Sequence, residues 1–293
     1  MTKIKVFSLS LVVALAMTGC GLKIAGVDVG KTFESVANVV GSGSMSANER
    51  LNWGIEMTAV ILGATEVHPN QDLQLYVNQV GSWVASHANL TVDEERFTDW
   101  RFIVVDSKDF NAFAMPGGFI IISSGAIEML SSEAELAAIL AHEIIHVEQD
   151  HHVNAILDFK RTEGLTNLAF LANDARQVSR NDVTPDYIIK RVVSAEVADI
   201  AHKLYLDGIS RDDELDADSK AVVLLTRAGY DPYAYLSVLQ MVDSLEDDRK
   251  VILSSTHPDI EDRIAVAYDN ITYVESYLNR TQTGQQRFAS MME

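Results

Sequence analysis

The chain has 293 residues, of which 47% are hydrophobic and 22% charged, and its formal net charge is −19. This composition excludes a disordered or fibrous chain, because it supplies enough apolar surface to bury the core of one large domain or two small ones. The acidic charge also argues against nucleic acid as a partner, since phosphate binding needs clustered lysines and arginines.

The first twenty residues have the order of a bacterial secretory signal. Lys3 and Lys5 precede an apolar run over residues 6–16, and the small residues Thr18 and Gly19 stand directly before Cys20. The run is too short to span a bilayer comfortably, and its small-residue end suits a signal peptidase. The sequence therefore predicts a signal peptide over residues 1–19.

Cys20 is the only cysteine in the chain, so an intramolecular disulfide is excluded. A small residue directly before a cysteine resembles the bacterial lipobox, in which the cysteine is lipidated and becomes the mature N-terminus. Gly21 stands where an aspartate would signal retention in the inner membrane. The resemblance therefore implies a lipoprotein on the periplasmic face of the outer membrane. An ordinary cleaved signal followed by a stray cysteine is the alternative.

The rest of the chain divides by composition. Residues 20–48 contain several glycines and serines and no sustained periodicity, which predicts a lipidated N-terminus followed by a flexible tether. We expect a folded domain over residues 49–278. A polar tail is expected over residues 279–293, which is too short for a tetratricopeptide repeat.

The predicted domain begins with helices and continues with short strands. Helical periodicity runs over residues 49–63, and a second helix is predicted over residues 72–87, with apolar positions at spacings of three and four. Three β-rich runs follow at residues 101–106, 110–115 and 119–123, separated by turn compositions. These runs predict a small antiparallel sheet.

A helix with metal-binding spacing comes next. It is predicted to begin after Ser132, which forms a capping-box pattern with Glu135, and to run to about Gln149. It contains the HExxH sequence at residues 142–146. Four residues advance a helix by about 400°, so both imidazoles project from one face within reach of a single tetrahedral ion. Glu143 is then placed to act on water as a general base.

A catalytic zinc needs a third protein ligand, and two candidates exist. His152 lies six residues after His146, but an unbroken helix would rotate it by some 240° from that residue. His151 and His152 are therefore expected to be solvated, or to support the ligands from behind.

The better candidate is Glu214, in the acidic segment 211–218 at the start of a helix predicted to end at Gly229. Helical spacing puts Glu214 and Asp218 on one face. This pair suits a zinc site, because the first carboxylate can bind the ion while the second holds a histidine N–H and fixes its tautomer. The alternative is a solvated acidic first turn that the helix dipole favours.

Four stretches stand in the order of a known family: Asn111–Gly118, His142–His146, Ser210–Asp218, and Thr256–Pro258 with Arg263. Together they resemble the minigluzincin peptidases that include HtpX and the CAAX prenyl endopeptidase, and especially periplasmic lipoprotein members such as LoiP and BepA. The resemblance covers residues 49–278. It implies a mostly helical, zincin-type α+β metallopeptidase domain with a small antiparallel sheet next to the HExxH helix.

The same resemblance implies a zinc-dependent endopeptidase with one Zn²⁺ per chain. Its substrates would be polypeptides, in particular unfolded or misassembled envelope proteins, and its role would be protein quality control at the cell envelope. The implied site consists of the metal ligands His142, His146 and Glu214, the catalytic base Glu143, and the ligand-orienting residues Asp218 and Arg211.

His257 is a further candidate. Pro258 restricts His257 to extended geometry, so its side chain should project away from the helix that begins near Asp259. Close to an open zinc position, such a histidine would either donate to the oxyanion or occupy the fourth coordination site and inhibit the enzyme. A helix-capping histidine without a catalytic role is the alternative.

Substrate would be held extended, by pairing with an edge strand of the hairpin over residues 110–123. Two rival functions remain. One is a zinc-containing, chaperone-like or binding lipoprotein of the envelope with little proteolysis. The other is a structural lipoprotein whose HExxH motif is accidental.

Overall fold

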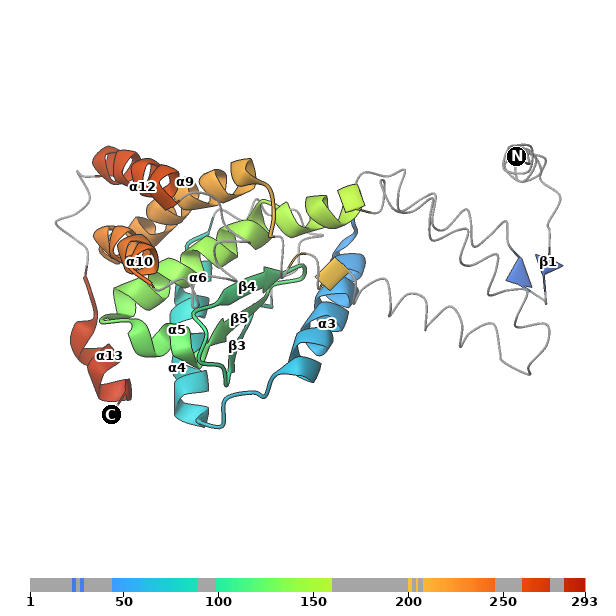
Figure 1. Cartoon of the computed structure of the whole chain (residues 1–293), viewed down its shortest axis with the longest axis horizontal. Coiled ribbons are helices and arrows are strands. Elements are labelled where there is room, and N and C mark those ends of the chain that lie inside the picture. The colour runs from blue at the N-terminus through green and yellow to red at the C-terminus, as the bar shows by residue number, and fades with distance from the viewer. Residues whose placement is uncertain are drawn as a thin grey trace, which may run out of the picture. The chain divides into compact units, whose positions relative to one another are not determined.

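Figure 1 shows the computed structural model of the chain. The chain divides into two compact units, one of residues 1–45 and 157–196 and the other of residues 46–156 and 197–293. The described residues are 23–24, 27–28, 44–88, 99–159, 200–201, 204, 208–245, 260–274 and 282–292.

In the first unit the structure describes a short antiparallel pair, β1 (Lys23–Ile24) and β2 (Val27–Asp28). The pair lies within the predicted tether. The predicted signal peptide and Cys20 lie outside the described residues, so both stay predictions, as do the domain boundaries. Within the described part of the chain, none of the helices has the length and apolar character needed to cross a membrane.

The second unit is mostly helical with one small sheet, which confirms the predicted α+β class. Its strands are β3 (Arg101–Val105), β4 (Ala112–Met115) and β5 (Phe119–Ser123). Its helices are α3 (Ala47–Ala64), α4 (Gln71–Ala85), α5 (Ser124–Met129), α6 (Glu133–Glu148), α9 (Arg211–Arg227), α10 (Tyr233–Asp243), α12 (Ile260–Val274) and α13 (Gln285–Met292).

The sheet is mixed, with β5 between β3 and β4. β5 pairs antiparallel with β4, as predicted, but parallel with β3, so the prediction of a wholly antiparallel sheet is wrong. Every residue of β5 is buried. An uninterrupted apolar strand favours a central position with neighbours on both sides. β3 therefore occupies the far side of β5, and β4 remains an edge strand.

Glycines bring the β4–β5 hairpin close to α3. Gly117 and Gly118 both have φ of +76°, a conformation that residues with a Cβ adopt only at a cost. A Cβ on Gly54 of α3 would lie 1.9 Å from the carbonyl oxygen of Pro116 in the hairpin loop. A larger residue at Gly54 would therefore have to displace either the helix or the loop.

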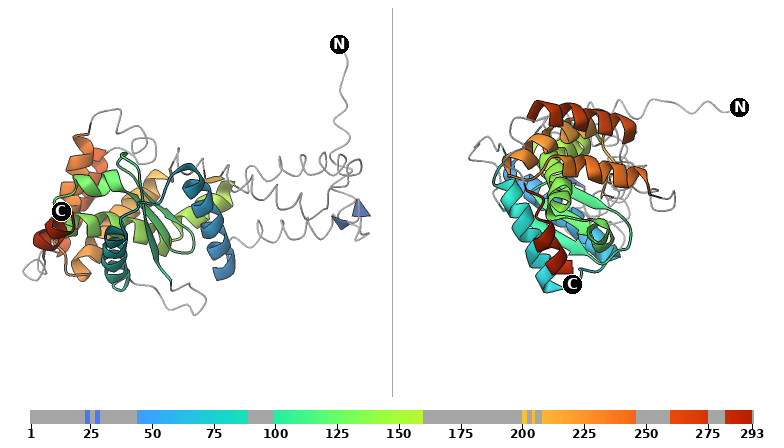
Figure 2. Two further views of the ribbon diagram at one scale, coloured as in Figure 1. Left: turned by 90° about the horizontal axis from the view of Figure 1, so that it is seen from below. Right: turned by 90° about the vertical axis from the view of Figure 1, so that its left-hand side faces the viewer.

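Different helices cover the two faces of the sheet (Figure 2). Successive side chains of a strand point to opposite faces. Ile120 and Ile122 belong to the main hydrophobic core, where α4 and α6 pack. On the other face, Phe119 lies against Gly54, and the sulfur of Met115 lies 3.4 Å from the Thr58 hydroxyl of α3.

α6 runs through the centre of the unit, between the sheet and α9 (Figure 1). It begins after Ser132, whose side chain accepts from the N–H of Glu135, as the sequence predicts. All its residues except Glu135 and Val147 are buried. A helix that is buried all round is a rigid base for a site, because packing restricts each of its side chains.

The predicted polar tail contains α13, which packs against α4 and α6. Phe288 of α13 is buried, and two guanidinium nitrogens of Arg287 donate to the carboxylate of Glu133 at 3.0 and 2.5 Å. The hydroxyls of Tyr76 and Tyr230 donate to the same buried carboxylate at 2.8 and 2.9 Å. Sequence reasoning missed this helix because one phenylalanine in a polar segment gives little periodic signal.

The Glu133 cluster leads to a prediction about acid stability. Burial opposes ionisation of Glu133, but hydrogen bonds from Arg287, Tyr76 and Tyr230 outweigh burial and hold the pKa of this carboxyl below its ordinary value of 4.5. Its stabilising effect is therefore complete above pH 4.5 and is lost as the pH falls through the lower pKa of the folded state. We expect Glu133→Gln to reduce the free energy of unfolding at neutral pH by about 1–3 kcal/mol.

Urea denaturation across a pH series measures this effect. The difference between wild type and Glu133→Gln should shrink as the pH falls. Replacing the exposed Glu128 by glutamine is the control, and it should change the free energy of unfolding by less than about 0.5 kcal/mol. A difference for Glu133→Gln that is constant over the whole pH range would contradict the prediction.

Candidate metal centre and active site

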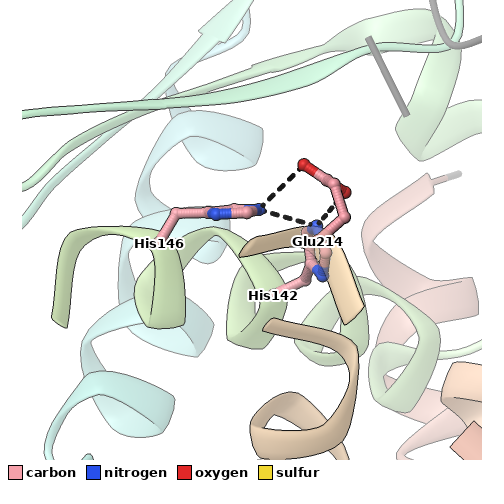
Figure 3. Close-up of side chains that lie close together, drawn as sticks. All are labelled: His142, His146 and Glu214. Carbon is pink, nitrogen blue, oxygen red and sulfur yellow. Dashed lines mark hydrogen bonds and ion pairs between the residues drawn. The ribbon is translucent and has the colours of Figure 1, made fainter. Parts of the chain in front are cut away.

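α6 presents two histidines to the same buried space (Figure 3). The side chains of His142 and His146 are 5% and 2% exposed, and their Nε2 atoms lie 2.9 Å apart. Their rings meet edge to face, with centroids 4.5 Å apart. The four-residue spacing thus brings the two imidazoles together, as the helix period predicts.

The third side chain of the cluster comes from α9, which packs along α6. α9 begins after Ser210, whose hydroxyl accepts from the N–H of Asp213 at 3.2 Å. Glu214 follows in the first turn and is buried. Its carboxylate oxygens lie 3.4 Å from Nε2 of His142 and 3.5 Å from Nε2 of His146.

These three residues fit a bound metal ion. Their ligand atoms all lie within 4.8 Å of one another, and within the described part of the chain they form the one such group. Burial opposes a charge on His142, but the carboxylates of Asp218 and Glu214 outweigh it and raise the pKa of His142 to about 9. The cluster therefore favours positive charge. Two imidazole nitrogens and one carboxylate oxygen are also ligands that zinc accepts in catalytic sites.

Glu143 lies next to the cluster and faces the sheet. The backbone of Ala114 in β4 is hydrogen-bonded to its carboxylate. Burial raises the pKa of Glu143 to about 7, although the charge of His142 and the Ala114 hydrogen bond act in the opposite direction. A carboxyl group with a pKa near neutrality can both accept a proton and return it, which is what a general base and acid must do.

Asp218 lies one turn after Glu214 and holds His142 from behind. Its Oδ1 is 3.2 Å from Nδ1 of His142. The hydroxyl of Tyr235, from α10, lies 2.8 Å from the same nitrogen and donates to Asp218. Arg263, from α12, donates to both oxygens of Asp218 at 2.8 and 2.7 Å. Burial alone would raise the pKa of Asp218, but the charge of Arg263 outweighs it and keeps that pKa well below its ordinary value.

Sequence reasoning did not assign roles to Tyr235 or Arg263. Arg263 could have been found, because it shares the buried face of α12 with Ala267, Ile271 and Val274. A charged residue in an apolar stripe signals a buried partner. Nothing in the sequence connects Tyr235 with His142, because that contact depends on how α10 packs against α6.

The remaining site residues that the sequence suggested lie at different places in the structure. Arg211 lies at the start of α9, where its half-exposed side chain pairs with Asp262 of α12. Its expected role behind the metal ligands stays a prediction. His257 lies outside the described residues. His151 and His152 are both buried, so of their two expected positions the solvated one is wrong, and support of the ligands from behind stays a prediction.

A cleft of about 330 Å³ runs beside the cluster. Asn111, Ala112 and Phe113 line it from the edge strand and the residue before it. Glu143, His146 and Glu214 line it from the helices. An extended chain in this cleft would therefore meet the backbone of β4 on one side, and Glu143 with two of the candidate metal ligands on the other.

Comparison with known proteins finds relatives that are named as proteases. The chain is 26% identical over 254 residues to the "Beta-barrel assembly-enhancing protease" of Escherichia coli K12, which covers 86% of this chain and 50% of that protein. It is 28% identical over 160 residues to the "Mitochondrial metalloendopeptidase OMA1" of Arabidopsis thaliana, covering 54% of this chain and 29% of that protein.

A third relative has nearly the same length. The "Metalloprotease YcaL" of Escherichia coli K12 is 22% identical over 258 residues, covering 88% of this chain and 93% of that protein. By contrast, the chain spans about half the length of the beta-barrel assembly-enhancing proteases that it matches. The profile of Peptidase family M48 matches residues 71–270, which include the whole cluster, and the chain therefore belongs to this peptidase family.

Proposed function

We propose that this protein is a zinc-dependent endopeptidase of the HExxH gluzincin type. The observation that carries the proposal is the buried cluster of His142, His146 and Glu214 at a cleft bordered by the edge strand β4. In this proposal, the three residues hold one Zn²⁺, Glu143 is the catalytic base, and Asp218 orients His142.

The chemistry follows from the positions of the side chains. When bound, Zn²⁺ supplies a Lewis acid for the scissile carbonyl and makes a nearby water more acidic. Glu143 takes the proton from the attacking water and delivers it to the leaving amine. An extended peptide adds to the outer edge of β4 in the described sheet, so that main-chain hydrogen bonds provide affinity with modest side-chain selectivity.

The proposed place of action is the cell envelope. The name of the relative in Escherichia coli K12, "Beta-barrel assembly-enhancing protease", supports a role in quality control of envelope proteins. We propose unfolded or misassembled envelope proteins as substrates. Lipidation of Cys20 would anchor the protein to the periplasmic face of the outer membrane. A chaperone-like zinc lipoprotein with little proteolysis is the alternative.

Replacing Glu143 by glutamine tests whether the protein cleaves peptides with Glu143 as its base. The change removes the base and keeps the metal ligands, so we expect about one zinc per chain and a fall in peptide cleavage of at least about 100-fold. Metal analysis and digestion of an unfolded protein such as casein measure the two quantities. The exposed Glu128→Gln variant should cleave like wild type. Undiminished cleavage by Glu143→Gln would exclude the mechanism, and a wild-type protein that binds zinc without cleaving would favour the alternative.

Replacing Cys20 by alanine tests the anchor. The variant should be unlipidated and recovered in the soluble fraction, because a stable anchor needs the acyl chains. Membrane fractionation in high salt and mass spectrometry of the N-terminus measure the result. Gly21→Asp is the matched control and should remain lipidated but move to the inner membrane. Continued membrane retention of Cys20→Ala would contradict the proposed anchor.

Replacing His257 by alanine distinguishes its two proposed roles. Cleavage should increase if His257 occupies the fourth coordination site of the resting enzyme, because its removal opens that site to substrate. Cleavage should decrease if His257 donates to the oxyanion. Initial rates at equal zinc content are the measurement. Unchanged rates would exclude both roles.

A further inference from the structure

A sharp turn follows α6 directly after the cluster. Gln149 caps the helix, and Asp150 adopts a left-handed φ of +58°, which an aspartate tolerates better than most residues. The chain then starts a new helical segment over residues 151–159. The carboxylate of Asp150 pairs with the guanidinium of Arg50 on α3 at 2.8 Å. This turn changes where His151 points, because an unbroken helix would rotate it about 140° from His146.

The turn brings His151 against the far side of His146. The Nδ1 atoms of the two rings lie 2.9 Å apart, and both side chains are buried. Two imidazole nitrogens at this distance need one donor and one acceptor. Nε2 of His146 faces His142 and Glu214, so it is the nitrogen that would bind a metal. His146 then carries its proton on Nδ1, and His151 is the acceptor.

The other nitrogen of His151 faces α9. Its Nε2 lies 3.4 Å from a carboxylate oxygen of Asp216 and 3.7 Å from one of Asp213. Asp216 is also bound by Lys220 at 2.7 Å, and Lys220 donates to the side chain of Gln149 at 2.6 Å. A proton on Nε2 of His151 is therefore favoured by negative charge, which leaves Nδ1 as the acceptor that His146 needs.

We propose that His151 is a positioning residue that orients His146 toward the metal, with the carboxylate of Asp216 orienting His151 in turn. The inference rests on the proposed function, because it assumes that His146 is a ligand. A metal-bound histidine usually donates its second N–H to a carboxylate or carbonyl group, and loss of that partner weakens metal binding about 10- to 100-fold. At His146 the partner is a second imidazole. α9 thus supports His142 directly through Asp218. It supports His146 indirectly, because Asp216 orients His151 and His151 orients His146.

The test measures Zn²⁺ affinity of the full chain by competition with a chromophoric chelator, independently of cleavage. His151→Ala removes the acceptor and should weaken Zn²⁺ binding about 10- to 100-fold. His151→Asn keeps an acceptor oxygen near the position of Nδ1 and should restore most of the affinity. The absorption spectrum of the Co²⁺-loaded protein should change in His151→Ala and return toward wild type in His151→Asn. Replacement of the exposed Glu128 by glutamine should change neither quantity.

The outcomes separate the inference from the proposed function. Wild-type protein that binds no Zn²⁺ overturns both. Equal Zn²⁺ affinity of wild type and His151→Ala overturns the inference alone. So does a loss of Zn²⁺ affinity in His151→Ala that His151→Asn fails to restore. If His151→Ala does not fold, Asp216→Asn replaces it, because Asp216 is partly exposed and its change leaves the buried rings in place. Asp216→Asn should weaken Zn²⁺ binding severalfold, and unchanged affinity would count against the proposal.

Discussion

The contact between the acidic face of α9 and the histidine face of α6 is the interaction on which the rest of the site depends. It brings two carboxylates, Glu214 and Asp218, into a buried space beside two imidazoles. Buried carboxylates are costly unless they are paired and hydrogen-bonded. The surrounding helices supply that compensation, with Arg263 from α12 and Tyr235 from α10 both bound to Asp218.

The balance of charge in this space explains why the cluster suits a metal ion. Arg263 donates twice to Asp218, whereas its nearest contact with Glu214 is 3.8 Å long. The guanidinium therefore compensates Asp218 more directly than Glu214. Burial lowers the pKa of His142, but Asp218 and Glu214 together outweigh it and raise this pKa, so the space still favours positive charge. A divalent ion would satisfy Glu214 and both imidazoles together. Metal binding should then also stabilise the folded state, because the unfolded chain does not hold these ligands together.

The two imidazoles are held in different ways. His142 meets Asp218 and Tyr235, whose side chains are both buried. His146 meets His151, whose position depends on the left-handed residue Asp150 and its pairing with Arg50 of α3. Because α3 also lies against the β4–β5 hairpin, the same helix touches both the turn behind His146 and the strand that borders the cleft. Changes in α3 should therefore act on both sides of the site.

The local parts of this site follow from the sequence by itself. The spacing of His142 and His146 places them on one face of any helix, and the spacing of Glu214 and Asp218 does the same on another. The Ser132 cap marks where the first of these helices begins. Strand and helix periodicity predicted individual elements such as the two first helices and the three strands, because these patterns arise from backbone geometry over a few residues. The mostly helical α+β class followed from the family resemblance.

Tertiary structure alone decided which of these faces meet and what lies behind them. The parallel pairing of β3 with β5, the contact of Tyr235 with His142 and the docking of α13 join residues far apart in the chain. Their formation depends on packing complementarity, which leaves no periodic trace in the sequence. The burial of His151 depends on one left-handed aspartate. Helical periodicity could not predict it, because a single residue with positive φ breaks the helical period and redirects the side chains that follow.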